Sequence, residues 1–279
     1  MIAINDFDVN KSEHKLWEND ENSTVIRYFP AKEKKSDAAI VIFAGGGYKS
    51  RAVHESDGYA EFFSSIGVDS FVVDYRVIPD HFPAQLLDAR RGVRFVRYYA
   101  EKYGIDKEKI AVIGSSAGGH LAAFVSTYKE KVDGEGVDEI DEENAIPNAQ
   151  ILCYAVSSAA DEEILNVGTF TNLMGDDFSP ENAKKFSPDL LADENTPQAF
   201  IWHTANDLSV NVIQSYAYAS ALRRKNVPVE MHIFPEGPHG LGLAKNNKWV
   251  GRCDEKIMSH VCRWADLLEE WLKYIGWLS

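Results

Sequence analysis

The sequence predicts an α/β fold in which a mainly parallel, doubly wound sheet is flanked by helices. Continuous apolar runs at residues 38–43 and 110–113 have the composition of strands that are buried on both faces. Helical patterns such as residues 56–66 lie between runs of this kind, and such alternation is typical of parallel sheets. Because the chain has 279 residues and no internal repeat, we expect one domain over residues 1–279.

The strands and helices are expected in alternation along the whole chain. Strands are expected at residues 24–29, 38–43, 68–73, 110–113, 150–156, 199–203 and 229–234. Helices are expected at residues 56–66, 83–103, just beyond 116, 210–225 and 253–274. The first run, 24–29, alternates only weakly and precedes Pro30, so we predict that it forms an outer strand.

The long helix at residues 83–103 is expected to be amphipathic. Apolar residues that include Leu86 and Val93 form its inner stripe. Its arginines are expected mostly on the outer face: Arg90, Arg91, Arg94 and Arg97.

Two segments interrupt the alternation of strands and helices. Residues 129–148 are rich in Gly, Asp and Glu, which predicts an acidic surface insertion. Residues 157–196 are polar, turn-rich and only briefly helical. We expect this second segment to form a small cap over the carboxyl edge of the sheet.

The charge and composition of the sequence disfavour several kinds of partner and of structural site. The net charge of −14 disfavours nucleic acid and anionic membranes. Cys153, Cys253 and Cys262 have no tight spacing, so neither a disulfide framework nor a zinc site is indicated, and no cofactor is expected. No stretch approaches the roughly 18 apolar residues of a membrane span, and no secretory leader pattern opens the sequence, so a cytoplasmic location is expected.

The stretch Gly114-x-Ser116-x-Gly118 lies between a β-branched run and a helical pattern. This is the form of a nucleophile elbow, in which a strand turns directly into a helix and exposes the central serine. Glycines fit the flanking positions because side chains there would collide with the crossing backbone. The helix N-terminus that follows presents backbone N–H groups to developing negative charge. We therefore predict that Ser116 is a nucleophile.

A serine hydroxyl needs a base, and the base needs an acid that orients it. In this architecture the order along the chain is serine, acid, histidine, each at the carboxyl end of a strand. Asp207 follows the strand that ends near His203, and His239 follows the strand that ends near Phe234. We predict that Asp207 is the acid and His239 the base.

Other histidines and aspartates compete for these roles. His203 and His232 lie inside predicted strands, where a structural role is favoured. His120, one helical turn beyond the serine, is expected to pack beneath the elbow, while His54 and His81 are placed in loops that could border the pocket. The aspartates in the polar segment are expected to be solvated or capping residues: Asp176, Asp177 and Asp189.

The glycine run at residues 45–47 directly follows a buried strand. One interpretation is a flexible turn. The other, which its position favours, is that the backbone N–H groups of Gly46 and Gly47 approach a substrate oxygen. Together with the Ala117 N–H they would form an oxyanion hole.

With these motifs the sequence resembles the α/β-hydrolase superfamily, in the branch of hormone-sensitive-lipase-like esterases. Residues 44–48 resemble the oxyanion motif of that branch, and residues 114–119 its nucleophile motif. The resemblance is closer to bacterial sugar esterases of the acetylxylan-esterase kind, whose pattern is matched at residues 51–55, 202–207 and 232–243. The leading histidine of the oxyanion motif is replaced by Ala44, as in that sugar-esterase group.

The resemblance implies hydrolysis of a small acyl ester, with acetyl on a sugar hydroxyl as the leading substrate.

Tyr48 and Trp249 could stack on a sugar ring or could be packing residues. Arg51 and His54, with the adjacent Glu55, either line the pocket or pin the glycine loop.

The triad of Ser116, Asp207 and His239 would also suit an amidase, a peptidase or an arylformamidase. A binding protein on an inactive hydrolase scaffold is a further alternative. The predicted partner is a small ester, and the possibility of a homo-oligomer stays open.

Overall fold

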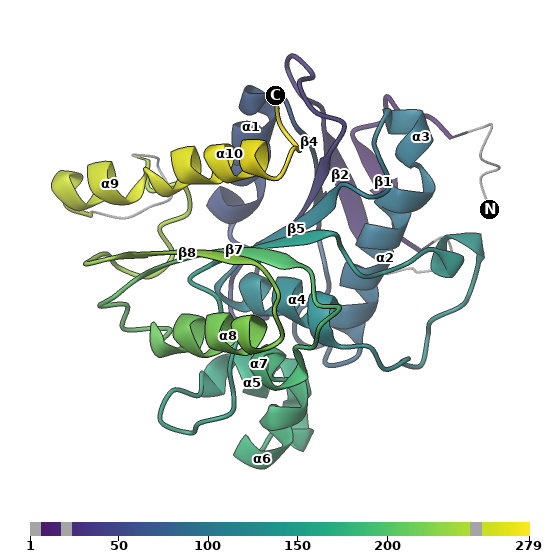
Figure 1. Cartoon of the computed structure of the whole chain (residues 1–279). Coiled ribbons are helices and arrows are strands. Elements are labelled where there is room, and N and C mark those ends of the chain that lie inside the picture. Colours follow the sequence, from purple (N-terminus) through teal and green to yellow (C-terminus); the bar gives the residue numbers. More distant parts are fainter. Residues whose placement is uncertain (1–6, 18–23, 246–252) are drawn as a thin grey trace.

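The computed structural model describes residues 7–17, 24–245 and 253–279 (Figure 1). These residues form an eight-stranded sheet in the order β1–β2–β4–β3–β5–β6–β7–β8. β2 pairs antiparallel with β1 and β4, while every pair from β4 to β8 is parallel. The predicted mainly parallel sheet is confirmed. Its strands are β1 (Glu13–Lys15), β2 (Val25–Phe29), β3 (Ala39–Phe43), β4 (Asp69–Val73), β5 (Ile110–Ser115), β6 (Ala149–Cys153), β7 (Gln198–Thr204) and β8 (Val229–Phe234).

Helices cover both faces of this sheet (Figure 1). One face packs against α1 (Val53–Ile66), α9 (Glu255–Val261) and α10 (Trp264–Tyr274). The other packs against α2 (Ala84–Tyr98), α3 (Ala100–Tyr103), α4 (Ser116–Thr127) and α8 (Ile213–Arg224). Because both faces are covered, strand residues of either parity are buried, which explains the continuous apolar runs in the sequence.

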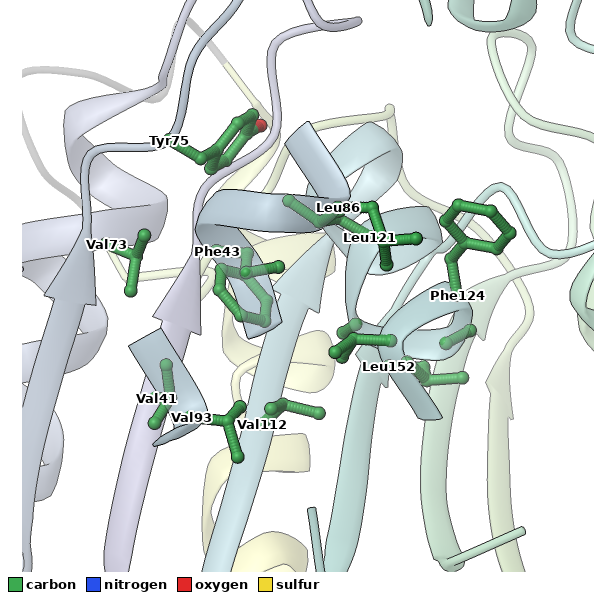
Figure 2. Packing of buried hydrophobic residues seen from close by; sticks show 14 of the residues in the cluster. Val41, Phe43, Val73, Tyr75, Leu86, Val93, Val112, Leu121, Phe124 and Leu152 are labelled. Carbon is green, nitrogen blue, oxygen red and sulfur yellow. The ribbon is translucent and has the colours of Figure 1, made fainter. Parts of the chain in front are cut away.

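β5 lies near the middle of the sheet, between β3 and β6. Figure 2 shows the packing on one of its faces, with side chains from three strands and two helices: Val41, Val112, Leu152, Val93 and Leu121. All five are at most 1% exposed. Burying such side chains contributes roughly 1.5–3 kcal/mol each, so the carboxyl end of β5 is held firmly in the centre of the molecule.

The arginines of α2 do not lie on a solvated outer face, so the prediction for them is wrong. Arg90, Arg91 and Arg97 are only 4%, 2% and 4% exposed, although an outer, solvated face was expected for them. The reason is that residues 129–148 lie along this side of α2 and carry the matching charges. Arg91 contacts Asp138 at 2.5 Å and Asp141 at 2.9 Å, and Asp141 belongs to the 3₁₀-helix η2 (Glu139–Glu142).

The edge of the sheet also differs from the prediction. β2 is not outermost, because the three-residue strand β1 pairs with it at the edge. Three residues are too few for an alternating pattern to be visible in the sequence. The predicted helix 83–103 is divided into α2 and α3, and the predicted helix 253–274 into α9 and α10.

The segment 157–196 holds short helices joined by turns. They are α5 (Val167–Met174), η3 (Gly175–Asp177), α6 (Pro180–Ala183), η4 (Lys184–Phe186) and α7 (Pro188–Leu191). α5 contacts the glycine loop after β3, where Asn172 Nδ2 donates to the Gly47 carbonyl at 2.7 Å. Within the described ranges, no helix is long and apolar enough to cross a membrane.

Candidate active site

Ser116 lies at a sharp turn between strand and helix. β5 ends at Ser115, and α4 begins at Ser116, whose φ of 54° is in the left-handed region. Such a backbone costs on the order of 1–3 kcal/mol and persists only where the surroundings impose it. The surroundings are tight here, since a Cβ on Gly114 would lie 2.0 Å from the Gly118 carbonyl oxygen. The predicted elbow geometry is therefore present.

Two other strand ends bring the predicted partners to Ser116. Asp207 follows β7, and His239 follows β8, the neighbouring strand. His239 Nε2 lies 2.8 Å from Ser116 Oγ, and His239 Nδ1 lies 2.7 Å from Asp207 Oδ2. Residues separated by more than a hundred positions thus form one chain of hydrogen bonds.

The Asp207 carboxylate is buried but well supplied with donors. Oδ1 accepts from the N–H groups of Ser209 at 2.8 Å and Val210 at 3.0 Å. Burial by itself would raise the pKa of Asp207, but hydrogen bonds from His203 and His239 outweigh it and hold the pKa well below its usual value. An ionised Asp207 accepts a hydrogen bond from Nδ1–H of His239, which leaves Nε2 without a proton and able to accept from the Ser116 hydroxyl.

His203 lies behind this carboxylate, inside β7, as predicted for a structural histidine. Its Nε2 donates to the Val210 carbonyl at 3.1 Å and is 3.3 Å from Asp207 Oδ2, while Nδ1 accepts from Ser215 Oγ at 2.8 Å. Both ring nitrogens are therefore satisfied.

The glycine loop after β3 presents unused backbone donors. Gly46 and Gly47 have φ values of 136° and 63°, and a Cβ on Gly46 would lie 2.2 Å from the Ser50 carbonyl oxygen. Within the described part of the chain, no acceptor receives either of their N–H groups. Ala117 is in the first turn of α4, where backbone N–H groups have no intrahelical partner.

The structure corrects the candidate substrate contact at Tyr48 in favour of packing, the other role that the sequence left open for this residue. Tyr48 was a candidate for stacking on substrate, yet its side chain is fully buried. Its backbone φ of 57° turns the ring inward, where it packs edge-on against Tyr75 and His120. Its hydroxyl lies 2.7 Å from His120 Nδ1. A ring in this position supports the loop from below and offers no face to a ligand.

The remaining candidate substrate contacts are engaged with the protein. Arg51 Nη1 donates to the Tyr75 carbonyl at 2.6 Å. His54 lies in α1, not in a loop as expected, and its Nε2 donates to the Gly240 carbonyl at 2.8 Å. Both side chains hold backbone in place, but His54 contacts the loop that carries His239 and not the glycine loop. Trp249 lies outside the described residues.

Two further histidines are not members of the hydrogen-bond chain. His120 packs beneath the elbow as predicted, and its Nε2 donates to the Phe186 carbonyl at 2.8 Å. His81 Nδ1 donates to the Asn172 carbonyl at 2.8 Å.

The site also contains residues whose importance the sequence did not indicate, namely Asn172 and Tyr154. For Glu55 the sequence did contain a signal. Its i+4 spacing with apolar residues of α1 places the carboxylate on the buried face of that helix.

Across the described ranges, no group of three or more His, Cys, Asp or Glu side chains is arranged to hold a metal ion.

The sheet order, the elbow and the strand-end positions of Asp207 and His239 define an α/β-hydrolase. The chain belongs to the BD-FAE family, whose model matches residues 27–222. This confirms the predicted superfamily and the predicted sugar-esterase branch within it.

Curated relatives and solved structures agree with this assignment. Endo-1,4-beta-xylanase B of Butyrivibrio fibrisolvens is 30% identical over 88% of this chain, and acetylxylan esterase of Xylanibacter ruminicola is 28% identical over 92%. The chain spans only 40% and 49% of the lengths of these two relatives. The crystal structure of an acetyl ester-xyloside bifunctional hydrolase from Caldicellulosiruptor lactoaceticus is 37% identical, with a TM-score of 0.84 over 96% of this chain and 97% of that one.

Proposed function

We propose that this protein is a serine carboxylesterase that cleaves small acyl esters. The observation that carries the proposal is the continuous hydrogen-bond chain from Asp207 through His239 to Ser116. A chain of this kind makes a serine hydroxyl nucleophilic, because the imidazole accepts its proton and the carboxylate stabilises the imidazolium that forms. The relatives and solved structures named as esterases support the same reaction class.

In the proposed first half-reaction, Ser116 Oγ attacks the ester carbonyl carbon while His239 Nε2 takes the hydroxyl proton. The carbonyl oxygen gains negative charge and is stabilised by the N–H groups of Gly46, Gly47 and Ala117. His239 then gives its proton to the leaving alcohol, and the bond between carbonyl carbon and alcohol oxygen breaks. The product is an acyl-enzyme on Ser116.

In the second half-reaction, His239 takes a proton from water, whose oxygen attacks the acyl-enzyme carbonyl. The same backbone donors stabilise the second tetrahedral intermediate. Its collapse returns the proton to Ser116 Oγ through His239 and releases the carboxylic acid. The protein's own groups complete this cycle.

The substrate we propose is an acetyl ester on a sugar or a xylo-oligosaccharide. The printed names of two similar proteins, an acetylxylan esterase and an acetyl ester-xyloside hydrolase, support this choice. Acetylated xylo-oligosaccharides, N-formylkynurenine and short peptides should be compared as substrates. Higher kcat/KM on the acetylated sugar supports the proposal, and higher kcat/KM on either of the other two favours an arylformamidase or a peptidase.

Replacing the nucleophile tests the proposed mechanism. Ser116→Ala should lower kcat on p-nitrophenyl acetate by at least about 10⁴-fold, because the attacking oxygen is lost. Circular dichroism checks that the variant is folded, and Ser126→Ala, a buried serine further along α4, is the matched control.

Labelling gives an independent readout of the same residue. A fluorophosphonate should label the wild type and not Ser116→Ala. A folded Ser116→Ala variant that keeps wild-type turnover would refute the assignment. A wild type that neither turns over esters nor takes the label would favour a binding protein on a hydrolase scaffold.

A further inference from the structure

Glu55 is a buried carboxylate between the glycine loop and the core. It lies in the first turn of α1 and is 2% exposed. Its Oε2 accepts from the Gly45 N–H at 2.8 Å, and its Oε1 accepts from the Tyr154 hydroxyl at 2.6 Å. Burying a carboxylate is costly unless donors compensate it. Here the donors come from the loop that carries Gly46 and Gly47, and from the residue just after β6.

Tyr154 extends the contact to the loop that carries His239. Its hydroxyl oxygen accepts from the Gly242 N–H at 2.9 Å, and its ring packs edge-on against the His239 ring, with centroids 5.0 Å apart. The adjacent residue of α1 contacts the same loop, because His54 Nε2 donates to the Gly240 carbonyl at 2.8 Å. Glu55 and Tyr154 therefore join two loops that lie far apart in the sequence.

The local sequence is adapted to this contact. A Cβ on Gly45 would lie 2.4 Å from Glu55 Oε2, so only glycine lets the carboxylate approach the backbone. Tyr154 has a φ of 37°, an unusual backbone for a bulky residue. Ala44 cannot brace the glycine loop with a side chain. The side chains that do so are Glu55 at Gly45, Tyr75, whose hydroxyl donates to the Ala44 carbonyl at 2.5 Å, and Asn172 at the Gly47 carbonyl.

We propose that Glu55 is a positioning residue which, through Tyr154, holds the oxyanion donors and the base loop in register with Ser116. This proposal rests on the esterase function proposed above. Glu55 touches neither the substrate nor the reacting atoms. Its contribution is to keep the Gly46 and Gly47 N–H groups aimed at the developing oxyanion, and the His239 ring at the serine hydroxyl.

A graded series of substitutions tests this role. Glu55→Ala removes both acceptors, and we expect kcat on p-nitrophenyl acetate to fall about 10²-fold with KM changed by less than about threefold, because small misplacements of transition-state donors are costly. Glu55→Gln keeps the volume and one acceptor for Gly45, so it should restore kcat to within about tenfold of wild type. Tyr154→Phe should fall between the two.

Matched controls remove general effects of the substitutions. Tyr218→Phe deletes an equally buried hydroxyl, one that donates to Gln150 at the amino end of β6. Glu61→Gln makes the same chemical change as Glu55→Gln at an exposed position of α1. Both controls should keep wild-type kcat.

The Ki of a trifluoromethyl ketone is a readout that a purely structural role of Glu55 would leave unchanged. The ketone forms a tetrahedral adduct with an active serine, so its Ki should rise in parallel with the loss of kcat/KM across the series. If Glu55→Ala does not fold, Tyr154→Phe and Glu55→Gln carry the test.

The outcomes separate this proposal from the proposed function. A folded Glu55→Ala or Tyr154→Phe variant with kcat within about twofold of wild type, or one in which only KM rises, overturns the positioning role alone. A wild type that is inert to both ester and fluorophosphonate overturns the esterase function, and the positioning role with it.

Discussion

At the scale of single residues, the site depends on backbone conformations that most side chains avoid. Ser116 has a φ of 54° and Gly46 a φ of 136°, and an added Cβ at Gly46, or at Gly114 beside the serine, would collide with neighbouring backbone. Strain of this kind is stable only when the core around it is rigid. The buried residues beneath the elbow are therefore as important for the geometry as the residues that point into the site.

His120 is one of these buried residues, and it gives a testable dependence of stability on pH. Burial lowers the pKa of His120 from 6.5 to about 4. At pH values between about 4 and 6.5, His120 binds a proton in the unfolded chain but not in the folded protein. The stability contributed by neutral His120 is therefore present above pH 6.5 and is lost as pH falls toward about 4.

Urea unfolding of wild type and His120→Gln at neutral and mildly acidic pH measures this contribution. The glutamine amide can reach the position of Nε2 and donate to the Phe186 carbonyl, but it cannot titrate. The loss of stability of His120→Gln between neutral pH and pH of about 4.5 should therefore be smaller by on the order of 2 kcal/mol. Tyr48→Phe keeps the imidazole and should keep the wild-type pH dependence. An equal loss of unfolding free energy with falling pH in the wild type and in His120→Gln would contradict the prediction.

At the scale of elements, α2 and the acidic segment 129–148 stabilise one another. Arg91 is 2% exposed in its side chain and contacts Asp138 and Asp141, the latter with a fully buried side chain. Arg90 contacts Glu135 in the same way. The arginines lie between the helix and the segment, so the segment covers charges that would otherwise be solvated.

Removing one partner of such a pair leaves the other buried and uncompensated. Arg91→Ala should therefore lower the free energy of unfolding by about 3–5 kcal/mol. Lys107→Ala removes a more exposed ion pair, with Glu143 of the same segment, and should cost at most about 1 kcal/mol. Chemical denaturation measures both values. Equal, small effects would show that the Arg91 network contributes little.

At the scale of the whole molecule, the net charge of −14 acts on every charged substrate that approaches. A negatively charged protein repels anions over distances set by the Debye length, which is about 30 Å at 0.01 M salt and about 8 Å at 0.15 M. Neutral esters do not experience this repulsion. The substrate class proposed here, acetylated neutral sugars, is compatible with it.

A matched pair of esters tests the effect of charge. We expect 4-acetoxybenzoate, an anion, to have a lower kcat/KM than its neutral methyl ester at about 0.01 M salt, and the ratio to approach a constant near about 0.15 M. The neutral ester serves as the control for direct effects of salt on the enzyme. A ratio independent of salt would show that long-range charge does not influence substrate access.

Several features were visible in the sequence because they depend on local structure. The nucleophile elbow needs glycines at fixed offsets from its serine, and residues 114–118 have them. The strands before Asp207 and His239 were recognisable as apolar runs, and parallel strands bring their carboxyl ends to one edge. The order of Ser116, Asp207 and His239 along the chain was therefore enough to predict that they meet.

Other features could not be read from local patterns. Tyr48 follows the glycine run as a ligand-stacking residue would, but the fold turns it into the core. The arginines of α2 have the spacing of a solvated face, yet a segment some forty residues later covers them. In both cases the deciding contact is with residues far away in the sequence.

By itself, the sequence determined the alternation of strands and helices, the elbow at Ser116 and the edge of the sheet where Asp207 and His239 would lie. These depend on periodicity and on backbone sterics, which act over a few residues. Only the tertiary structure decided that Glu55 and Tyr154 join the glycine loop to the His239 loop. Contacts of this kind depend on how α1 and β6 pack across the core, and packing is a property of the assembled fold.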